Sequence, residues 1–280
     1  MLKGLTKAGL GAVESDKQLI ELAAAGGFRA VDTDAKGLIE QYGEDGAKRL
    51  LEQNGLVLGA IGLSVEWRSD EETFLAGLPA LAEEAAAAKK LGCTRCCTYI
   101  LPSTDLKASH FALLATRRLR TCAQILGAYG IRLGLEFVGP HHLRTAWKHP
   151  FIWTLDETLD WIDTIGEPNV GLLFDSYHWY TNGHAIADIE RLQPHQIVHV
   201  HLNDAPDVPV KDVLDNGRLY PGEGVIDLPG FLSALKRIGY NGVVSQEILT
   251  SSAPEETPEQ LLRRSQQGFT RVFTAAGLEE

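Results

Sequence analysis

The sequence predicts a single domain over residues 1–280, folded as an α/β protein of the (β/α)8 TIM barrel type. Two observations predict this fold. Short apolar runs alternate with helical stretches along the chain, and a glycine closes most helical stretches before the next apolar run. Eight such units need about 250 residues. An open doubly wound sheet is the alternative, but Gly9-Leu10-Gly11 does not continue into the phosphate-binding motif that follows the first strand of such sheets.

Eight apolar runs are the predicted strands. They cover residues 4–10, 28–31, 56–63, 94–101, 131–137, 170–174, 197–202 and 242–248. Helices are predicted between them over residues 16–25, 73–91, 111–129, 155–165, 186–192 and 228–238. The polar and acidic stretch 251–260 indicates a loop that leads into a closing helix.

Glycine and capping residues mark the ends of these elements. Glycine accounts for 28 of 280 residues, or one in ten, which exceeds the usual level of about 7%. Ser15 is a candidate N-cap for the first helix. Gly92, Gly130, Gly166 and Gly239 each follow a helical stretch, where glycine is the favoured terminating residue.

The acidic balance of the chain excludes several classes of partner. There are 26 basic and 37 acidic residues, which gives a formal net charge of −11. Such a chain is a poor partner for nucleic acid or for an anionic membrane. No apolar run approaches 18 residues, and the N-terminal stretch lacks the long apolar core of a signal peptide. We therefore expect a cytoplasmic protein.

The four cysteines are expected to be reduced core thiols. Cys93 and Cys96 have the spacing of a redox or metal motif, but they stand at the start of a predicted strand. A redox pair usually opens a helix, because the helix dipole lowers the pKa of the thiol. A tetrahedral zinc site would need a second pair of ligands, which Cys122 alone does not supply.

Polar residues follow four consecutive predicted strands, from the fifth to the eighth. The active site of a (β/α)8 barrel lies at the C-terminal ends of its strands. The residues found there are Glu136, then Asp175 and His178, then His199, His201 and Asn203, and finally Glu247. A single glutamate at a strand end is usually a solvated or capping group, but four such coincidences on consecutive strands point to a site.

The geometry of a barrel brings these residues together. The fifth and eighth strands stand roughly 135° apart around the rim, so Glu136 and Glu247 would face each other across the mouth. Three carboxylates with no basic residue between them repel one another, and a divalent cation compensates them. His199 and His201 share one face of their strand, and His201 lies nearer the mouth. The sequence therefore predicts one ion (Mn²⁺, Mg²⁺, Co²⁺ or Zn²⁺) bound by Glu136, Asp175, His201 and Glu247.

At these residues the chain resembles the xylose isomerase-like barrel superfamily of sugar isomerases and epimerases. In that superfamily a glutamate, an aspartate, a histidine and a glutamate from the last four strands hold the metal. The Asp175-Ser-Tyr-His178 stretch matches the signature of the sixth strand, whose histidine touches the substrate. The run from Arg218 to Gly224 resembles the 2-keto-myo-inositol (inosose) isomerase branch. Ketose epimerases place an arginine where Asp207 stands here.

The resemblance implies proton transfer beside a carbonyl, through an enediolate. Glu136 and Glu247 are the expected acid/base pair, with no choice made between them as first base. His178 and Arg218 are expected to hold substrate oxygens. His142 and Trp67 are candidate substrate contacts, although a loop histidine and a core tryptophan are the alternatives. Trp179 could likewise stack on the substrate or pack in the core.

The expected substrate is an unphosphorylated sugar or polyol ketone of the inosose or ketose type. Glu223 lies within the glycine-rich stretch Pro221–Gly224 and would repel a phosphate. A dehydratase of inosose or 3-dehydroshikimate on the same barrel is the main alternative. An abasic-site endonuclease would call for extra histidines on earlier strands, and none precedes His110. An inert sugar-binding barrel and a homodimeric assembly both stay open.

Overall fold

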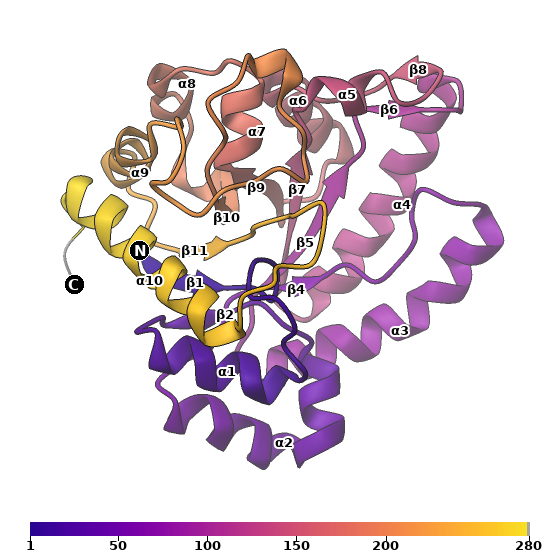
Figure 1. Ribbon diagram of the computed structural model, residues 1–280. Coiled ribbons are helices and arrows are strands. Elements are labelled where there is room, and N and C mark those ends of the chain that lie inside the picture. Colours follow the sequence, from indigo (N-terminus) through magenta and orange to yellow (C-terminus); the bar gives the residue numbers. More distant parts are fainter. Residues whose placement is uncertain (279–280) are drawn as a thin grey trace.

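Parallel strands form the centre of the computed structural model, which describes residues 1–278 (Figure 1). Their order in the sheet is β3-β2-β1-β11-β10-β9-β7-β5-β4. The strands are β1 (Leu2–Leu5), β2 (Ala30–Val31), β3 (Val57–Leu58), β4 (Ile61–Gly62), β5 (Arg95–Ile100), β7 (Arg132–Phe137), β9 (Val170–Asp175), β10 (Ile197–Leu202) and β11 (Val243–Gln246).

The two end strands of this sheet, β3 and β4, are pieces of one predicted strand, residues 56–63. β3 pairs with β2 through Ala30 and Val57, whereas β4 pairs with β5 through Ile61 and Cys96. The segment that contains both strands therefore closes the sheet into a barrel, and the predicted (β/α)8 fold is confirmed. Gly59 lies at the break, where an added Cβ would come within 2.3 Å of Asp32 Oδ1. Only glycine lets the chain pass this close to the aspartate.

Helices surround the barrel (Figure 1). The longer ones are α1 (Asp16–Ala25), α2 (Ala35–Gln53), α3 (Glu71–Lys90), α4 (Ala108–Ala128), α6 (Leu155–Ile165), α9 (Leu228–Arg237) and α10 (Pro258–Ala275). The shorter ones are α5 (His141–Arg144), α7 (Ser176–Thr181) and α8 (Ile186–Glu190), with 3-10 turns at Pro194–Gln196 and Val210–Asp212. A small antiparallel pair, β6 (Ser103–Thr104) and β8 (His149–Pro150), lies beside α5.

The helix α6 shows how the sequence sets an element boundary. The Thr154 hydroxyl accepts the Glu157 N–H at 3.3 Å, and the Glu157 carboxylate accepts the Thr154 N–H at 3.2 Å. This capping box satisfies backbone donors that have no partner within the helix. At the other end Gly166 adopts a left-handed conformation with φ 74°. The helix consequently occupies the predicted range, residues 155–165.

One strand lies elsewhere than predicted, and one long helix has no counterpart among the predicted elements. The first strand is expected over residues 4–10 but covers Leu2–Leu5, because Gly9 and Gly11 have φ values of 91° and 66°, which an extended strand does not allow. The second helix, α2, is not predicted. It bends at Gly43, where φ is 70° and ψ is 164°, and its other glycines hide the helical pattern.

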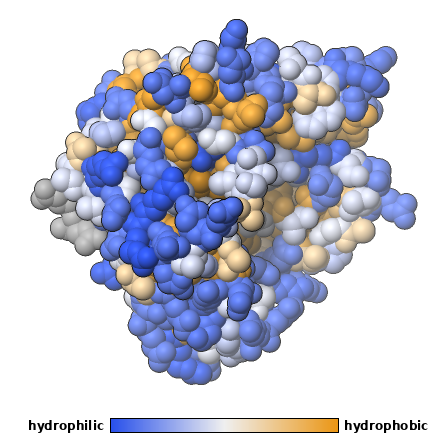
Figure 2. All heavy atoms as spheres, in the orientation of Figure 1, coloured by the Kyte–Doolittle hydropathy of each residue, from blue (hydrophilic) through white to orange (hydrophobic). Residues whose placement is uncertain are grey.

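The apolar residues form a continuous core between barrel and helices. Figure 2 shows hydrophilic side chains over the outer face of α1 and α2. All four cysteines are free, and burial raises the pKa of Cys93 to about 11 and that of Cys122 to about 12. Within residues 1–278, no helix combines the length and apolar character needed to cross a membrane.

Candidate metal centre

The four predicted ligands lie at one end of four neighbouring strands. Glu136 is in β7, Asp175 ends β9, His201 is in β10, and Glu247 directly follows β11. These strands are adjacent in the sheet and run parallel, so their C-terminal ends form one arc of the barrel rim. The sequence argument that placed these residues together depended only on this arrangement.

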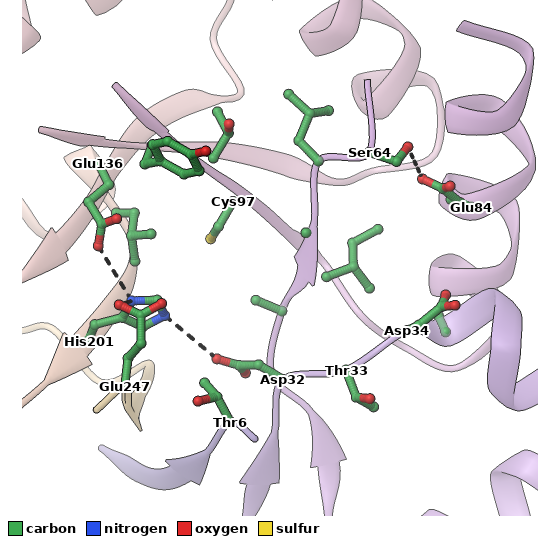
Figure 3. Close-up of a pocket in the computed structure, with 18 of the residues that line it drawn as sticks. Thr6, Asp32, Thr33, Asp34, Ser64, Glu84, Cys97, Glu136, His201 and Glu247 are labelled. Atoms are coloured by element: carbon green, nitrogen blue, oxygen red, sulfur yellow. Dashed lines mark hydrogen bonds and ion pairs between the residues drawn. The ribbon is translucent and has the colours of Figure 1, made fainter. Parts of the chain in front are cut away.

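The side chains converge on a single point. One ligand atom from each of the four residues lies within 4.8 Å of the other three. His201 Nδ1 is 3.4 Å from Glu136 Oε1 and 3.4 Å from Glu247 Oε2. Asp175 Oδ2 lies 3.9 Å from the same nitrogen. Figure 3 shows the Glu136 carboxylate pointing toward the His201 ring, which Glu247 overlies in this view.

These residues fit a divalent cation. His201 Nδ1 and Glu136 Oε1 are buried atoms that have no hydrogen-bond partner in the described part of the chain. Leaving buried polar atoms unpaired costs about 1–3 kcal/mol each, and a cation between them would satisfy both. Three carboxylates and one imidazole are donors that Mn²⁺, Mg²⁺, Co²⁺ and Zn²⁺ all accept, so the donor set does not select among these ions.

The electrostatics of the cluster separate the two glutamates. Burial raises the pKa of Glu136, and the negative charge of Glu247 acts in the same direction. Burial also opposes ionisation of Glu247, but His201 and Arg218 together hold its pKa well below the usual range. The carboxylates raise the pKa of His201 well above 6.5, although burial opposes this. The positive charges of His201 and Arg218 thus compensate the carboxylates of the cluster.

Arg218 corrects the expectation that no basic residue lies among the carboxylates. Its Nη1 donates to Glu247 Oε2 at 2.7 Å and to Asp175 Oδ2 at 3.0 Å. Its Nη2 donates to Asp215 Oδ1 at 2.8 Å and lies 3.3 Å from His178 Nε2. The loop that follows β10 carries the arginine into the site, because Gly217 forms a bridge with Thr250 and Leu219 with Asp204. Linear spacing does not reveal this fold-back.

Asn203 and Gly139 position other members of the site. The Asn203 side-chain amide donates to both Asp175 oxygens, at 3.2 and 3.0 Å, and to the Glu247 backbone carbonyl at 3.1 Å. The Gly139 N–H donates to His178 Nδ1 at 3.2 Å. Sequence analysis noted Asn203 at its strand end but gave it no role. A role could have been inferred from its position, because the strands on either side of Asn203 end in the predicted ligands Asp175 and Glu247.

His199 lies beside the ligand cluster and contacts Asp32. His199 Nε2 and Asp32 Oδ2 are 2.8 Å apart, and the same oxygen is 3.9 Å from His201 Nε2. Asp32, which follows β2, therefore connects the first half of the barrel to the histidines of β10. The sequence pattern assigns Asp32 no role, because its partner His199 is 167 positions away along the chain.

A cavity of about 540 Å³, which we call the mouth cavity, opens beside the cluster. The carboxylates that line it are Asp32, Asp34, Glu84, Glu136 and Glu247. The described lining contains two basic residues, His201 and Lys36, and the Lys36 ammonium is paired with Glu83 at 2.6 Å. Figure 3 shows the acidic side chains arranged around this space. The cavity accordingly suits a polar ligand without negative charge.

None of the five candidate substrate contacts is in the described lining of this cavity, although two of them, His178 and Arg218, adjoin the predicted ligands. Trp67 is fully buried, donates from Nε1 to Thr98 Oγ1 at 3.1 Å, and stacks on Phe111. Trp179 packs against Phe231. His142 is half-buried in α5. The structure therefore places both tryptophans in the core and groups neither them nor His142 with the metal ligands.

Fold and site together define a parallel (β/α)8 barrel with a candidate metal centre on its C-terminal rim. Residues 20–271 match the family described as xylose isomerase-like TIM barrel, and the chain belongs to this family. A xylose isomerase domain protein from Alicyclobacillus acidocaldarius has 34% identical sequence and superposes with a TM-score of 0.91 over 99% of both chains. The IOLI protein, solved with a bound zinc atom, shares the fold at 21% identity, with a TM-score of 0.78 over 98% of both chains.

Curated relatives include inosose isomerases. That of Bacillus velezensis is 34% identical over 164 residues, which are 58% of this chain and 55% of the relative. The chain thus spans about half the length of the curated relatives of this name that it matches. The 3-dehydroshikimate dehydratase of Pseudomonas aeruginosa is 32% identical over 140 residues, which are 49% of this chain and 20% of that protein.

Proposed function

We propose that the protein is a divalent-metal-dependent isomerase or epimerase that acts on a sugar or polyol ketone of the inosose or ketose type. The observation that carries this proposal is the convergence of Glu136, Asp175, His201 and Glu247 within 4.8 Å beside the mouth cavity. The names of the inosose isomerase relatives and the zinc in the IOLI structure support it.

The chain's own residues supply the proton transfers in this proposal. A bound divalent cation would polarise the substrate carbonyl and the adjacent hydroxyl. One of the two carboxylates, Glu136 or Glu247, takes the proton from the carbon beside the carbonyl, and the other delivers a proton. In isomerisation this proton goes to the former carbonyl carbon while the hydroxyl proton passes to the former carbonyl oxygen. In epimerisation it goes to the opposite face of the same carbon. Both glutamates line the mouth cavity, so each can reach a substrate held there.

His178 and Arg218 act on the substrate oxygens in this proposal. The Gly139 N–H donates to His178 Nδ1, which assigns the ring proton of a neutral His178 to Nε2. Arg218 Nη2, a second donor, lies 3.3 Å from that nitrogen. Two N–H donors this close repel each other, and a substrate oxygen that accepts from both would relieve the repulsion.

The substrate class follows from the charges of the mouth cavity. Five carboxylates line it, and its lysine is already paired with Glu83. A phosphorylated sugar would place a dianion against these groups. We therefore propose an unphosphorylated substrate, in agreement with the expectation from Glu223.

Metal removal and a substrate screen test the proposed function. Dialysis against a chelator should abolish conversion of inososes, ketohexoses or hydroxypyruvate, and addition of Mn²⁺, Mg²⁺, Co²⁺ or Zn²⁺ should restore it. The binding of each ion to the metal-free protein is measured separately by calorimetry. Full activity of protein that calorimetry and elemental analysis show to be metal-free would refute the metal role.

A dehydratase is the second candidate, and the match to 3-dehydroshikimate dehydratases is the observation that favours it. Both reactions begin with proton removal beside a carbonyl, so the same residues serve either one. Product mass separates them, because isomerisation conserves mass whereas dehydration removes one water. A cytoplasmic location and a homodimer stay predictions, and light scattering of the purified protein tests the second.

A further inference from the structure

A second cavity lies at the opposite end of the barrel, and we call it the floor cavity. It has a volume of about 160 Å³ and lies at the N-terminal ends of β5, β7 and β10. Arg95 and Arg132, the first residues of β5 and β7, line it. Arg132 precedes Glu136 by four positions on the same strand, which separates the two cavities by about 13 Å along β7.

The two arginines are neighbours in the sheet. Arg95 and Arg132 are register partners in the parallel pair of β5 and β7, and adjacent strands lie about 4.8 Å apart. Burial lowers the pKa of Arg132, and the positive charge of Arg95 lowers it further, as expected for two guanidinium groups in proximity. Like charges held side by side need compensation from another source.

No carboxylate of residues 1–278 provides that compensation. The described lining of the floor cavity contains no aspartate or glutamate, and neither arginine forms an ion pair within this range. Arg95 Nε donates to the Val198 carbonyl at 3.0 Å, and Arg132 donates to the carbonyls of Ile197 and His195. The two terminal nitrogens of Arg95 have no hydrogen-bond partner among the described residues. In a chain of net charge −11, two uncompensated cations in one cavity are a local exception.

We propose that the floor cavity binds a phosphate-type dianion, either as free inorganic phosphate or as the phosphoryl group of a small metabolite. A guanidinium presents several N–H donors in a planar fork that matches such oxygens. Thr94 and Asn241, which carry a hydroxyl and an amide, are also lining residues. The volume equals that of about five water molecules, which is sufficient for one such group. This site is independent of the metal centre and of the proposed function.

Calorimetry and thermal melting of the chelator-treated full chain test this site. Inorganic phosphate, compared with chloride at constant ionic strength, should bind and raise the melting temperature. Arg95→Gln should weaken binding about tenfold or more, because a charge-assisted hydrogen bond contributes at least that factor in affinity. Arg29→Gln is the matched control, since exposed Arg29 precedes β2 at the same end of the barrel and does not line the cavity. It should bind phosphate as the wild type does.

The proposal is overturned if phosphate has no specific effect on the wild type, or if its effect is equal in Arg95→Gln. If that variant does not fold, wild-type crystals grown with phosphate decide the question, because density must appear between Arg95 and Arg132. A sugar phosphate distinguishes the two sources. Tighter binding of glucose 6-phosphate than of inorganic phosphate assigns the site to a metabolite, and the reverse order assigns it to free phosphate. Binding of unmodified glucose with equal strength would also contradict the proposal.

Discussion

The two ends of the barrel differ in charge. The mouth cavity is lined by five carboxylates, whereas the floor cavity is lined by two arginines and, within residues 1–278, by no carboxylate. The strand β7 connects the two cavities, because it begins with Arg132 and carries Glu136 near its end. The net charge of −11 therefore conceals a separation along the barrel axis, with carboxylates gathered at one end and two guanidinium groups at the other.

Among the variants that distinguish the two ends, Glu247→Gln should have the largest effect, which is a loss of turnover. The substitution removes both a ligand charge and one member of the acid/base pair, so we expect turnover to fall by about 10²–10⁴-fold. Steady-state kinetics with saturating metal measure this loss, and circular dichroism checks the fold.

The same variant tests whether the two ends are independent. Phosphate should stabilise Glu247→Gln as it stabilises the wild type, and Arg29→Gln should retain both turnover and the response to phosphate. A phosphate effect that differs between Glu247→Gln and the wild type would show that the two ends are coupled.

Asn203→Ala should have an intermediate effect, confined to the mouth. Its amide holds both Asp175 oxygens and the Glu247 carbonyl, so its loss leaves two ligands less well oriented. Removal of a partner that orients a ligand typically costs 10- to 100-fold in metal affinity, and we expect a loss of about that size. Calorimetric titration of the metal-free protein measures it. Unchanged affinity in a folded variant would mean that Asn203 stabilises the loop without orienting the ligands.

Trp67→Phe should have the smallest effect and should change neither kind of binding. The indole Nε1 loses its bond to Thr98, and the smaller ring packs less well against Phe111, so we expect about 1–2 kcal/mol of lost stability. Urea unfolding measures this free energy. A large rise in KM with unchanged stability would instead return Trp67 to the substrate site suggested by the sequence.

The barrel and the ligand cluster are the two features that the sequence could predict. The barrel follows from alternating apolar and helical stretches, and the ligand cluster follows because parallel strands bring Glu136, Asp175, His201 and Glu247 to one rim. Both inferences need only local pattern and the symmetry of the fold. The segment that contains β3 and β4 was likewise predicted as one strand, and the close approach of Asp32 to Gly59 at its break is not visible in local sequence.

Contacts that depend on the path of a long loop, or on the direction of a side chain, could not be predicted in this way. Arg218 was expected to hold the substrate, but its pairing with Asp175 and Glu247 depends on how the loop after β10 folds back. Trp67 illustrates the opposite problem, since an aromatic residue after a strand suits a sugar face and a core equally well. The pairing of Arg95 with Arg132 depends on the register between two strands, which their separate sequences do not specify.

The pairing of β1 with β11 has a consequence for how the chain is made. Leu2 is the register partner of Val243, so one edge of the first strand has no neighbour until Val243 has left the ribosome. Until then that edge exposes unpaired backbone groups, which are templates for pairing with other chains. Glu247 follows the same late strand. Completion of the barrel during synthesis and completion of the candidate ligand set are therefore nearly the same event, and a nascent chain cannot bring the four residues together early.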